Sequence, residues 1–318
     1  MRQMTKKNIS IGLILFLGLV SCKQLGLEKE ETDNTLAIAA LAVFNNSRGS
    51  SVSSISSVSS SCNASTSTGS TITNSSATLG TDCVNGVTTC IDSAMPTWIK
   101  DNFKCVVAYI EGTNYVFKSK NIPNHNSGYF GSASALYEFS TGINPNTIIS
   151  QTFTYKVPIT PTTGSGTVST QGGYASVGIT TNGIAIFNNA AAPGDTLATE
   201  ATSFDNYFGH PQNSGVYHYH AGVPKVCHNS AKGTYTNATV CNNNNKLIGV
   251  ALDGYPIYSS KDANGNSPTL DTFQGTTSVT TEFPSGTYNY RYALNSTATI
   301  FTLISSFFRG TVGSISVN

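Results

Sequence analysis

Charged side chains are scarce in this sequence of 318 residues. Asp, Glu, Lys and Arg together make up 10% of it, and the net charge is +1, whereas a typical soluble domain carries about 25% charged residues. The few basic residues form no stripe, so we expect no nucleic-acid partner. The surface must therefore consist mainly of Ser, Thr, Asn and Gly.

Apolar runs long enough to span a membrane are also missing. Residues 9–20 (ISIGLILFLGLV) follow a basic segment with Arg2, Lys6 and Lys7, and they are too few to span a bilayer comfortably. We interpret residues 1–21 as a secretory signal peptide. No later stretch resembles a transmembrane helix.

The signal peptide is followed by a cysteine in the sequence Leu19-Val20-Ser21-Cys22, which resembles a bacterial lipobox. Cys22 would then become the lipidated first residue of the mature protein. Its acyl chains, such as palmitate, gain about 0.8 kcal/mol for each buried CH₂ and hold the protein on a membrane. The alternative is an ordinary signal peptide with an incidental cysteine. We expect a lipid-anchored protein of the cell envelope, at the outer membrane.

A polar segment separates this anchor from the rest of the chain. Residues 47–81 are almost entirely Ser, Thr, Gly and other small residues, and Arg48 is the only charge before Asp82. Such a segment buries too little apolar surface to offset its ordering entropy. We interpret residues 22–82 as a flexible stalk and residues 83–318 as the folded domain.

The cysteine count fits an oxidising compartment. Apart from Cys22, six cysteines remain, an even number. Proximity in sequence favours the pairs Cys83–Cys90 and Cys227–Cys241, which leaves Cys62–Cys105. No close CxxC pair occurs, so a metal site made of cysteines is not expected.

The folded domain is predicted to be mainly β. Three pairs of apolar segments read as hairpins: 104–110 with 115–119, 174–180 with 184–188 around Asn182-Gly183, and 247–252 with 255–258 around Asp253-Gly254. Residues 147–159 alternate as a strand. A short helix begins near Pro96. These patterns predict one β-rich domain, similar to a sandwich or a barrel.

Only five histidines occur in the chain, and two of them lie in Tyr217-His218-Tyr219-His220. On a strand, side chains alternate between faces, so the two imidazoles share one face and the two tyrosines the other. His210 lies shortly before them. Imidazoles suit transition metals, Zn or Cu above all. The predicted metal ligands are His210, His218 and His220, with Asp205, His125 and Asp253 as lesser candidates.

Part of the chain repeats this motif without its histidines. SGVYHYH at 214–220 matches SGTYNYR at 285–291, and FDNYFGH at 204–210 loosely matches LDTFQGT at 270–276. Asn289 and Arg291 stand where the first copy has His218 and His220. We therefore expect two related hairpin units, of which only the first keeps its imidazoles.

The sequence resembles the YHYH-domain protein family. The stretches that carry the resemblance run from about 117 to 310 and include SKNIPNHNSGYF, VGITTNGIAIFN, TSFDNYFGHPQNSGVYHYH and LIGVALDGYPIY. The resemblance implies a secreted or envelope domain, mostly β, and no particular reaction. Whether the protein is an enzyme stays open.

Three functions remain open from the sequence. The first is an envelope protein that binds a transition metal through its histidines. The second is a metal-free adhesion or structural module of the surface, in which His218 and His220 only brace loops through hydrogen bonds. The third is a metal-dependent hydrolase of envelope polymers; direct acid–base catalysis by His and Asp is a further alternative. A shared ion requires imidazole nitrogens within about 4.5 Å of one another.

Overall fold

The computed structural model describes residues 89–140, 142–164, 176–192, 194–220, 244–295, 300–303 and 307–317. All of them belong to one compact unit. The signal peptide, Cys22 and the stalk lie outside the described residues, so these interpretations stay predictions. None of the helices in the described ranges is long and apolar enough to cross a membrane.

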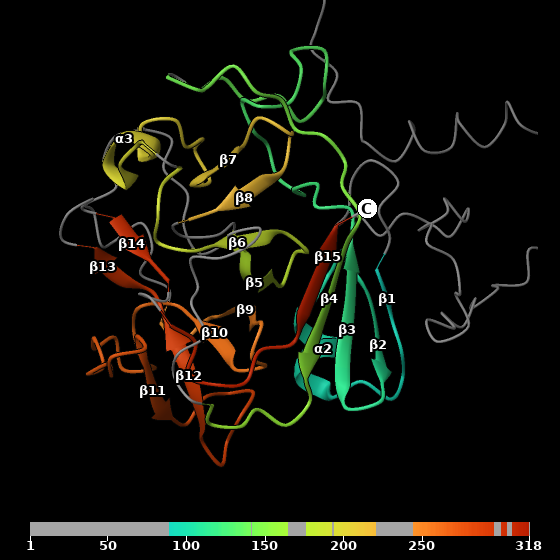
Figure 1. Cartoon of the computed structure of the whole chain (residues 1–318), viewed down its shortest axis with the longest axis vertical. Coiled ribbons are helices and arrows are strands. Elements are labelled where there is room, and N and C mark those ends of the chain that lie inside the picture. Colours follow the sequence, from blue (N-terminus) through green and yellow to red (C-terminus); the bar gives the residue numbers. More distant parts are fainter. Residues whose placement is uncertain are drawn as a thin grey trace, which may run out of the picture. The chain divides into compact units, whose positions relative to one another are not determined.

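A five-stranded sheet has the order β1-β2-β3-β4-β15. Its strands are β1 (Cys90–Ile91), β2 (Val107–Glu111), β3 (Asn114–Ser119), β4 (Phe153–Pro158) and β15 (Ser314–Val317). Helix α2 (Thr97–Asn102) lies beside it (Figure 1) and buries Ile99, and Pro96 precedes its first residue as expected.

Strand β4 is shorter than the predicted strand at 147–159. The residues before Phe153 bind loops instead of a strand: Ile148 N–H donates to Tyr129 O and Ile149 N–H donates to Gly215 O. Their apolar alternation therefore reflects packing against loops and not pairing in the sheet.

An eight-stranded sheet has the order β11-β12-β10-β9-β5-β6-β8-β7. Its strands are β5 (Ser176–Thr180), β6 (Ala185–Phe187), β7 (Gly209–Pro211), β8 (Tyr217–Tyr219), β9 (Leu247–Ala251), β10 (Pro256–Tyr258), β11 (Gly275–Ser278) and β12 (Thr287–Arg291). Helix α3 (Leu197–Ala201) lies in the connection between β6 and β7.

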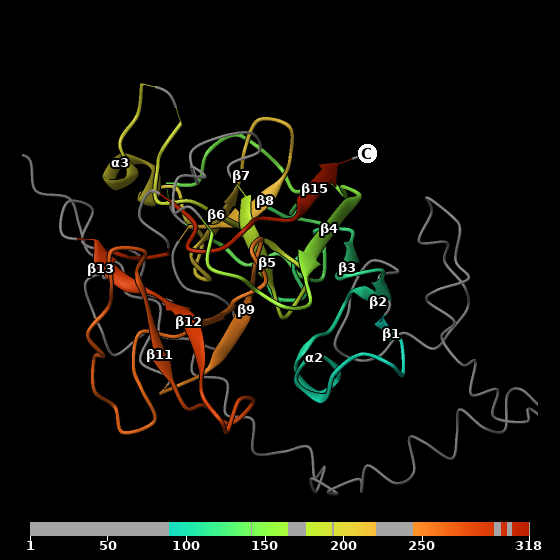
Figure 2. The same cartoon turned by 60° about the horizontal axis from the view of Figure 1, so that its bottom comes forward.

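The eight-stranded sheet consists of two equivalent units, β5–β8 and β9–β12. In each unit the first two strands form an antiparallel hairpin (β5·β6 and β9·β10), and the second strand pairs parallel with the fourth (β6·β8 and β10·β12). The third strand is short and closes the edge by pairing antiparallel with the fourth (β7·β8 and β11·β12). Figures 1 and 2 show the two units on either side of the β5·β9 pair. The expected repeat is therefore present. It is longer than the matching sequence stretches, because each unit also begins with an equivalent hairpin, β5·β6 or β9·β10.

The two units meet where β5 and β9 pair antiparallel. Gly178 pairs with Ala251 and Thr180 with Gly249, about a centre at Ile179 and Val250. A Cβ at Gly178 would collide with the carbonyl of Val250, and one at Gly249 with the carbonyl of Ile179. Glycine is thus required at the same place in both units, because the backbones approach too closely for a side chain.

The described strands form open sheets, including a small pair β13 (Ala293–Asn295) and β14 (Ile300–Thr302). The mainly β prediction is confirmed, and no barrel closes among the described strands. One apolar core joins the two large sheets; it includes Val106 and Phe117 from the first and Val177 and Ile186 from the second.

Cys90 and Cys105 both take part in disulfide bonds. The other cysteines of the expected pairs, Cys62, Cys83, Cys227 and Cys241, lie outside the described ranges. The pairing that sequence proximity favours therefore stays a prediction.

Candidate metal centre

Strands β7 and β8 bring three histidines together. They pair antiparallel, with His210 opposite His218, and His220 follows the end of β8. The alternation along β8 directs His218 and His220 to one face of the sheet, while Tyr217 and Tyr219 lie on the other, where His125 contacts both tyrosine rings.

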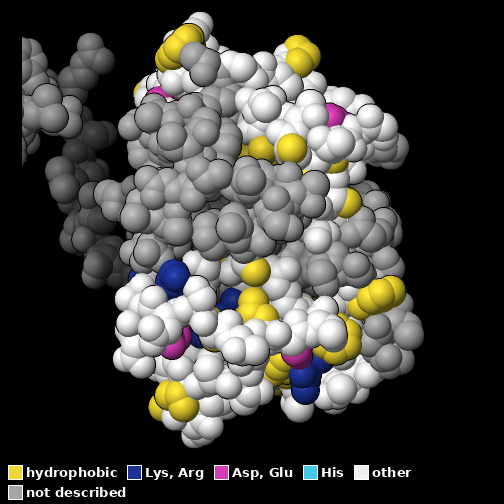
Figure 3. Space-filling model, turned by 90° about the vertical axis from the view of Figure 1, so that its left-hand side faces the viewer, with side chains coloured by type: hydrophobic (Ala, Val, Ile, Leu, Met, Phe, Trp, Pro, Cys, Tyr) yellow, Lys and Arg dark blue, Asp and Glu magenta, His cyan; other side chains and the backbone are white. Residues whose placement is uncertain are grey.

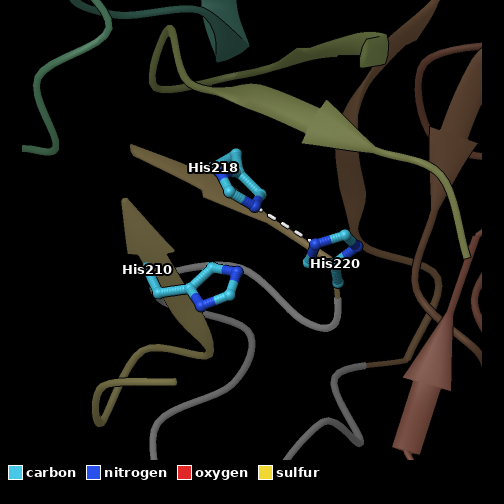
Figure 4. A group of neighbouring side chains, drawn as sticks. All are labelled: His210, His218 and His220. Atoms are coloured by element: carbon cyan, nitrogen blue, oxygen red, sulfur yellow. Dashed lines mark hydrogen bonds between the residues drawn. The ribbon is translucent and has the colours of Figure 1, made fainter. Parts of the chain in front are cut away.

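One nitrogen of each ring points towards a common centre (Figure 4). The three ligand atoms lie within 4.8 Å of one another, slightly wider than the predicted 4.5 Å, so the rings must move a little closer together to share one ion. Nε2 of His218 and Nε2 of His220 are 3.1 Å apart. Two atoms at about 2.0–2.1 Å from one ion lie about 3.3 Å apart at a tetrahedral angle.

The opposite nitrogen of each ring binds an oxygen of the protein. Nδ1 of His218 lies 3.0 Å from Val216 O, and Nδ1 of His220 lies 2.8 Å from Asn188 O. Because a carbonyl oxygen only accepts, both Nδ1 atoms carry the proton. Nε2 of each neutral ring therefore presents a lone pair to the centre.

His210 is held in the same way by a hydroxyl group. Its Nδ1 lies 2.6 Å from Oγ of Ser203, and this hydroxyl donates its single proton to Glu200 O at 2.7 Å. Ser203 therefore accepts from Nδ1, and Nε2 of His210 is the nitrogen left to act as a ligand. Such outer contacts to oxygen are typical of histidines that bind metals.

The cluster is buried, and burial disfavours a positive charge on His218 and His220. The three histidines are 2–3% exposed, and no histidine side chain is visible among the described residues on the face in Figure 3. Burial lowers the pKa of His220 to about 4. It also lowers the pKa of His218 well below its usual value, with His210 and His220 acting in the same direction.

Glu200 on helix α3 extends the site. Its Oε2 lies 3.4 Å from Nε2 of His220, and burial raises the pKa of this carboxyl group. Sequence analysis did not place Glu200 among the ligands. The only local signal was the helix start at Thr196, whose side chain accepts from Thr199 N–H, in the long connection before His210.

The structure does not bring His125 or Asp205 into the cluster. Nε2 of His125 lies 2.6 Å from the hydroxyl of Tyr219, on the opposite face of β8. Asp205 accepts four hydrogen bonds, from Ser127, Tyr207, Gly209 and Tyr217. Burial nevertheless raises its pKa to about 6. Both residues brace loops around the tyrosine face of the strand.

Asp253 lies even farther away, in the hairpin turn of the second unit. Its Oδ2 accepts from the hydroxyl of Tyr290 at 2.6 Å and from Gly310 N–H at 2.9 Å. Burial raises the pKa of this carboxyl group to about 6. It thus belongs to the equivalent tyrosine face of the second unit and not to the histidine cluster.

Arg291 occupies the place in the second unit that corresponds to His220. Its Nη1 donates to Ser259 O, just as His220 Nδ1 binds the carbonyl of Asn188 in the first unit. Ile257 pairs with Tyr290 on β10·β12 as Ile186 pairs with Tyr219 on β6·β8, which makes these carbonyls equivalent.

The guanidinium of Arg291 is fully buried among oxygen atoms. It also donates to Lys261 O at 2.8 Å and to Asn245 Oδ1 at 2.7 Å. Asn289, the counterpart of His218, donates to Thr287 O, as His218 binds Val216 O. In the second unit, a positive charge supplied by the chain therefore occupies the place of the missing imidazoles.

Residues 154–268 match the model of the YHYH protein family. The resemblance is thereby confirmed, over a narrower range than the expected 117–310. The YHYH match contains the histidine cluster and the hairpins β5·β6 and β9·β10, but it ends before β11 and β12. No curated protein and no solved structure is found to match the chain.

Proposed function

We propose that the protein is a lipid-anchored protein of the cell envelope whose YHYH domain binds one transition-metal ion through His210, His218 and His220. The basic segment, the apolar run and Cys22 at the N-terminus support the proposed lipid anchor. The geometry of the three imidazole rings supports the proposed metal site.

One observation carries the metal site: Nε2 of His218 and Nε2 of His220 are 3.1 Å apart while both Nδ1 atoms bind carbonyl oxygens. A hydrogen bond between the two Nε2 atoms would require a positively charged ring, and burial opposes that charge. Two lone pairs facing each other in a buried site repel. A metal cation between them turns this repulsion into coordination.

The second unit supports the same conclusion. At the corresponding position of the same backbone frame, the guanidinium of Arg291 places a cation against oxygen acceptors. The two units thus differ in the source of the positive charge: the chain supplies it in one, and an ion supplies it in the other. If the histidines formed only a metal-free hydrogen-bond network, the first unit would contain no positive charge at the position where the second unit has the guanidinium of Arg291.

Imidazole ligands suit Zn²⁺ or Cu²⁺. The detergent-solubilised chain, purified without chelators, is expected to carry about one metal ion per chain by elemental analysis. Substitution of both His218→Ala and His220→Ala is expected to abolish this content. The matched control is His125→Gln, which changes a buried histidine outside the cluster and should leave the metal content unchanged.

The metal-free surface module makes the opposite prediction. Wild-type protein without bound metal, whose melting temperature does not respond to added Zn²⁺ or Cu²⁺, would contradict the proposed function. An ion that binds to the native state and not to the unfolded chain must raise the melting temperature. Melting temperatures measured at increasing concentrations of Zn²⁺ or Cu²⁺ therefore distinguish the metal-binding protein from the metal-free surface module.

A further inference from the structure

The carboxylate of Glu200 has a place in the centre that hydrogen bonding does not explain. Its Oε2 is buried and has no hydrogen-bond donor within the described ranges, while Oε1 accepts only a long bond of 3.4 Å from Ala192 N–H. Nε2 of His220 lies 3.4 Å from Oε2. That nitrogen presents a lone pair, because Nδ1 of His220 binds Asn188 O.

We propose that Glu200 is the fourth ligand of the metal ion, through Oε2, on the side of His220. This inference rests on the proposed function, because it concerns the same ion. It assigns a site of three imidazole nitrogens and one carboxylate oxygen.

The separation of 3.4 Å between Glu200 Oε2 and His220 Nε2 fits direct binding to one ion. Two atoms bound to one ion at tetrahedral geometry lie about 3.3 Å apart. A carboxylate that acts only through a metal-bound water would leave the ligand field unchanged when it is removed, and this difference is what the test below measures.

Charge gives a second reason for a carboxylate at this place. Three neutral imidazoles leave the full charge of a divalent ion uncompensated in a buried site, which is costly. One carboxylate offsets half of that charge. An oxygen ligand also suits Zn²⁺ and other divalent ions better than Cu⁺, which prefers sulfur. The inferred cofactor is therefore a divalent ion.

Helix α3 positions Glu200, and the residues that follow the helix contact His210, another proposed ligand. Leu197 and Ala201 are the buried residues of the helix. The hydroxyl of Ser203 binds both Glu200 O and Nδ1 of His210. One short segment thus positions a carboxylate and an imidazole of the same site.

The test compares Glu200→Ala with Ser203→Ala in the full chain. Zn²⁺ affinity is measured by competition with a chelator, and the ligand field by the visible absorption spectrum of Co²⁺ bound in place of Zn²⁺. Ser203→Ala removes a contact outside the ligand shell, so it should weaken Zn²⁺ about 10–100-fold and leave the Co²⁺ bands in place. Glu200→Ala should weaken Zn²⁺ by more than that and shift the Co²⁺ bands, because water replaces a carboxylate.

The outcomes separate the two proposals. If the wild type binds neither Zn²⁺ nor Co²⁺, the proposed function fails. If the wild type binds both ions and Glu200→Ala leaves the Co²⁺ spectrum unchanged, only the role of Glu200 fails. Glu200→Gln guards against a folding defect: it keeps the shape of the side chain and should keep the melting temperature of the apo protein, but it should weaken Zn²⁺ because the negative charge is lost.

Discussion

His220 and Arg291 hold equivalent positions in the two units, and each binds the backbone carbonyl of an equivalent residue, Asn188 O for His220 and Ser259 O for Arg291. The contact is the same, but the chemistry differs, since an imidazole provides a ligand whereas a guanidinium provides the charge itself. The stability of the second unit should therefore not depend on metal.

Arg291→Met should destabilise the protein equally with and without metal. The change removes the charged hydrogen bonds that the guanidinium donates to Ser259 O, Lys261 O and Asn245 Oδ1, and a hydrogen bond to a charged group contributes about 1.5–3 kcal/mol. We expect the free energy of unfolding to fall by about 3 kcal/mol or more, measured by urea unfolding in Zn²⁺ and in chelator.

Arg309→Met serves as the control for this prediction. Its guanidinium pairs with Asp271 at 3.2 Å but is 30% exposed, so its loss should cost less than about 1 kcal/mol. If Arg291→Met costs no more than Arg309→Met, the guanidinium of Arg291 does not have the proposed role.

Three substitutions should create a second metal site. Thr276, Asn289 and Arg291 correspond to His210, His218 and His220, and Thr276 pairs with Asn289 as His210 pairs with His218. The variant with histidine at all three positions should bind about two ions per chain by elemental analysis. Binding of only one ion by a folded triple variant would show that the two units differ in more than these residues.

Asp253 should give a distinct pH dependence of stability. Its pKa is about 6 in the folded protein, above the ordinary value of 3.8, so the folded state binds a proton more tightly than the unfolded state. The resulting stabilisation is fully present below pH 3.8 and is lost as the pH rises through 6. It amounts to about 3 kcal/mol, at about 1.4 kcal/mol for each pKa unit.

The contribution of Asp253 is isolated by comparing wild type with Asp253→Asn at each pH, in chelator. The variant should gain stability relative to wild type as the pH rises from 4 to 7. Asp205, with a pKa of about 6, acts in the same direction, and His220 acts in the opposite one, but both are common to the two proteins. A difference that stays constant with pH would refute the prediction.

The equivalent residues Asp205 and Asp271 should differ in their importance for stability. Each accepts hydrogen bonds from two backbone N–H groups and from a tyrosine, Tyr217 or Tyr288. Asp205 is buried, whereas the side chain of Asp271 is 35% exposed.

Asp205→Ala should therefore cost about 3 kcal/mol or more in thermal or urea unfolding, because buried donors lose their acceptor. Asp271→Ala should cost about 1 kcal/mol, because water replaces the lost acceptor. Equal losses for the two variants would mean that burial does not set the strength of these contacts.

The sequence predicted the elements whose signals are local. The hairpins around Asn182-Gly183 and Asp253-Gly254 are present as β5·β6 and β9·β10, because the turn residues and the apolar runs point to the same structure. The convergence of His218 and His220 followed from alternation along one strand. His210 followed from its place shortly before them, as β7 pairs with β8.

Contacts that depend on tertiary packing were beyond the sequence. Glu200 Oε2 lies 3.4 Å from Nε2 of His220 although the two residues are far apart in the chain, and no spacing in the sequence encodes that approach. His125 and Asp253 were candidates for the cluster because of their residue types, yet they bind Tyr219 and Tyr290 on the tyrosine faces. Which face a loop residue reaches is decided by the path of the loop.

The pairing of β5 with β9 about Ile179 and Val250 has the form of an isologous interface between two identical subunits. In a true homodimer, every substitution occurs on both sides of such an interface. Here both units belong to one polypeptide, so a substitution can occur in one unit alone, while Gly178 and Gly249 preserve the pairing of β5 with β9. A covalently joined pseudo-dimer can thus retain three imidazoles on one side and an arginine on the other.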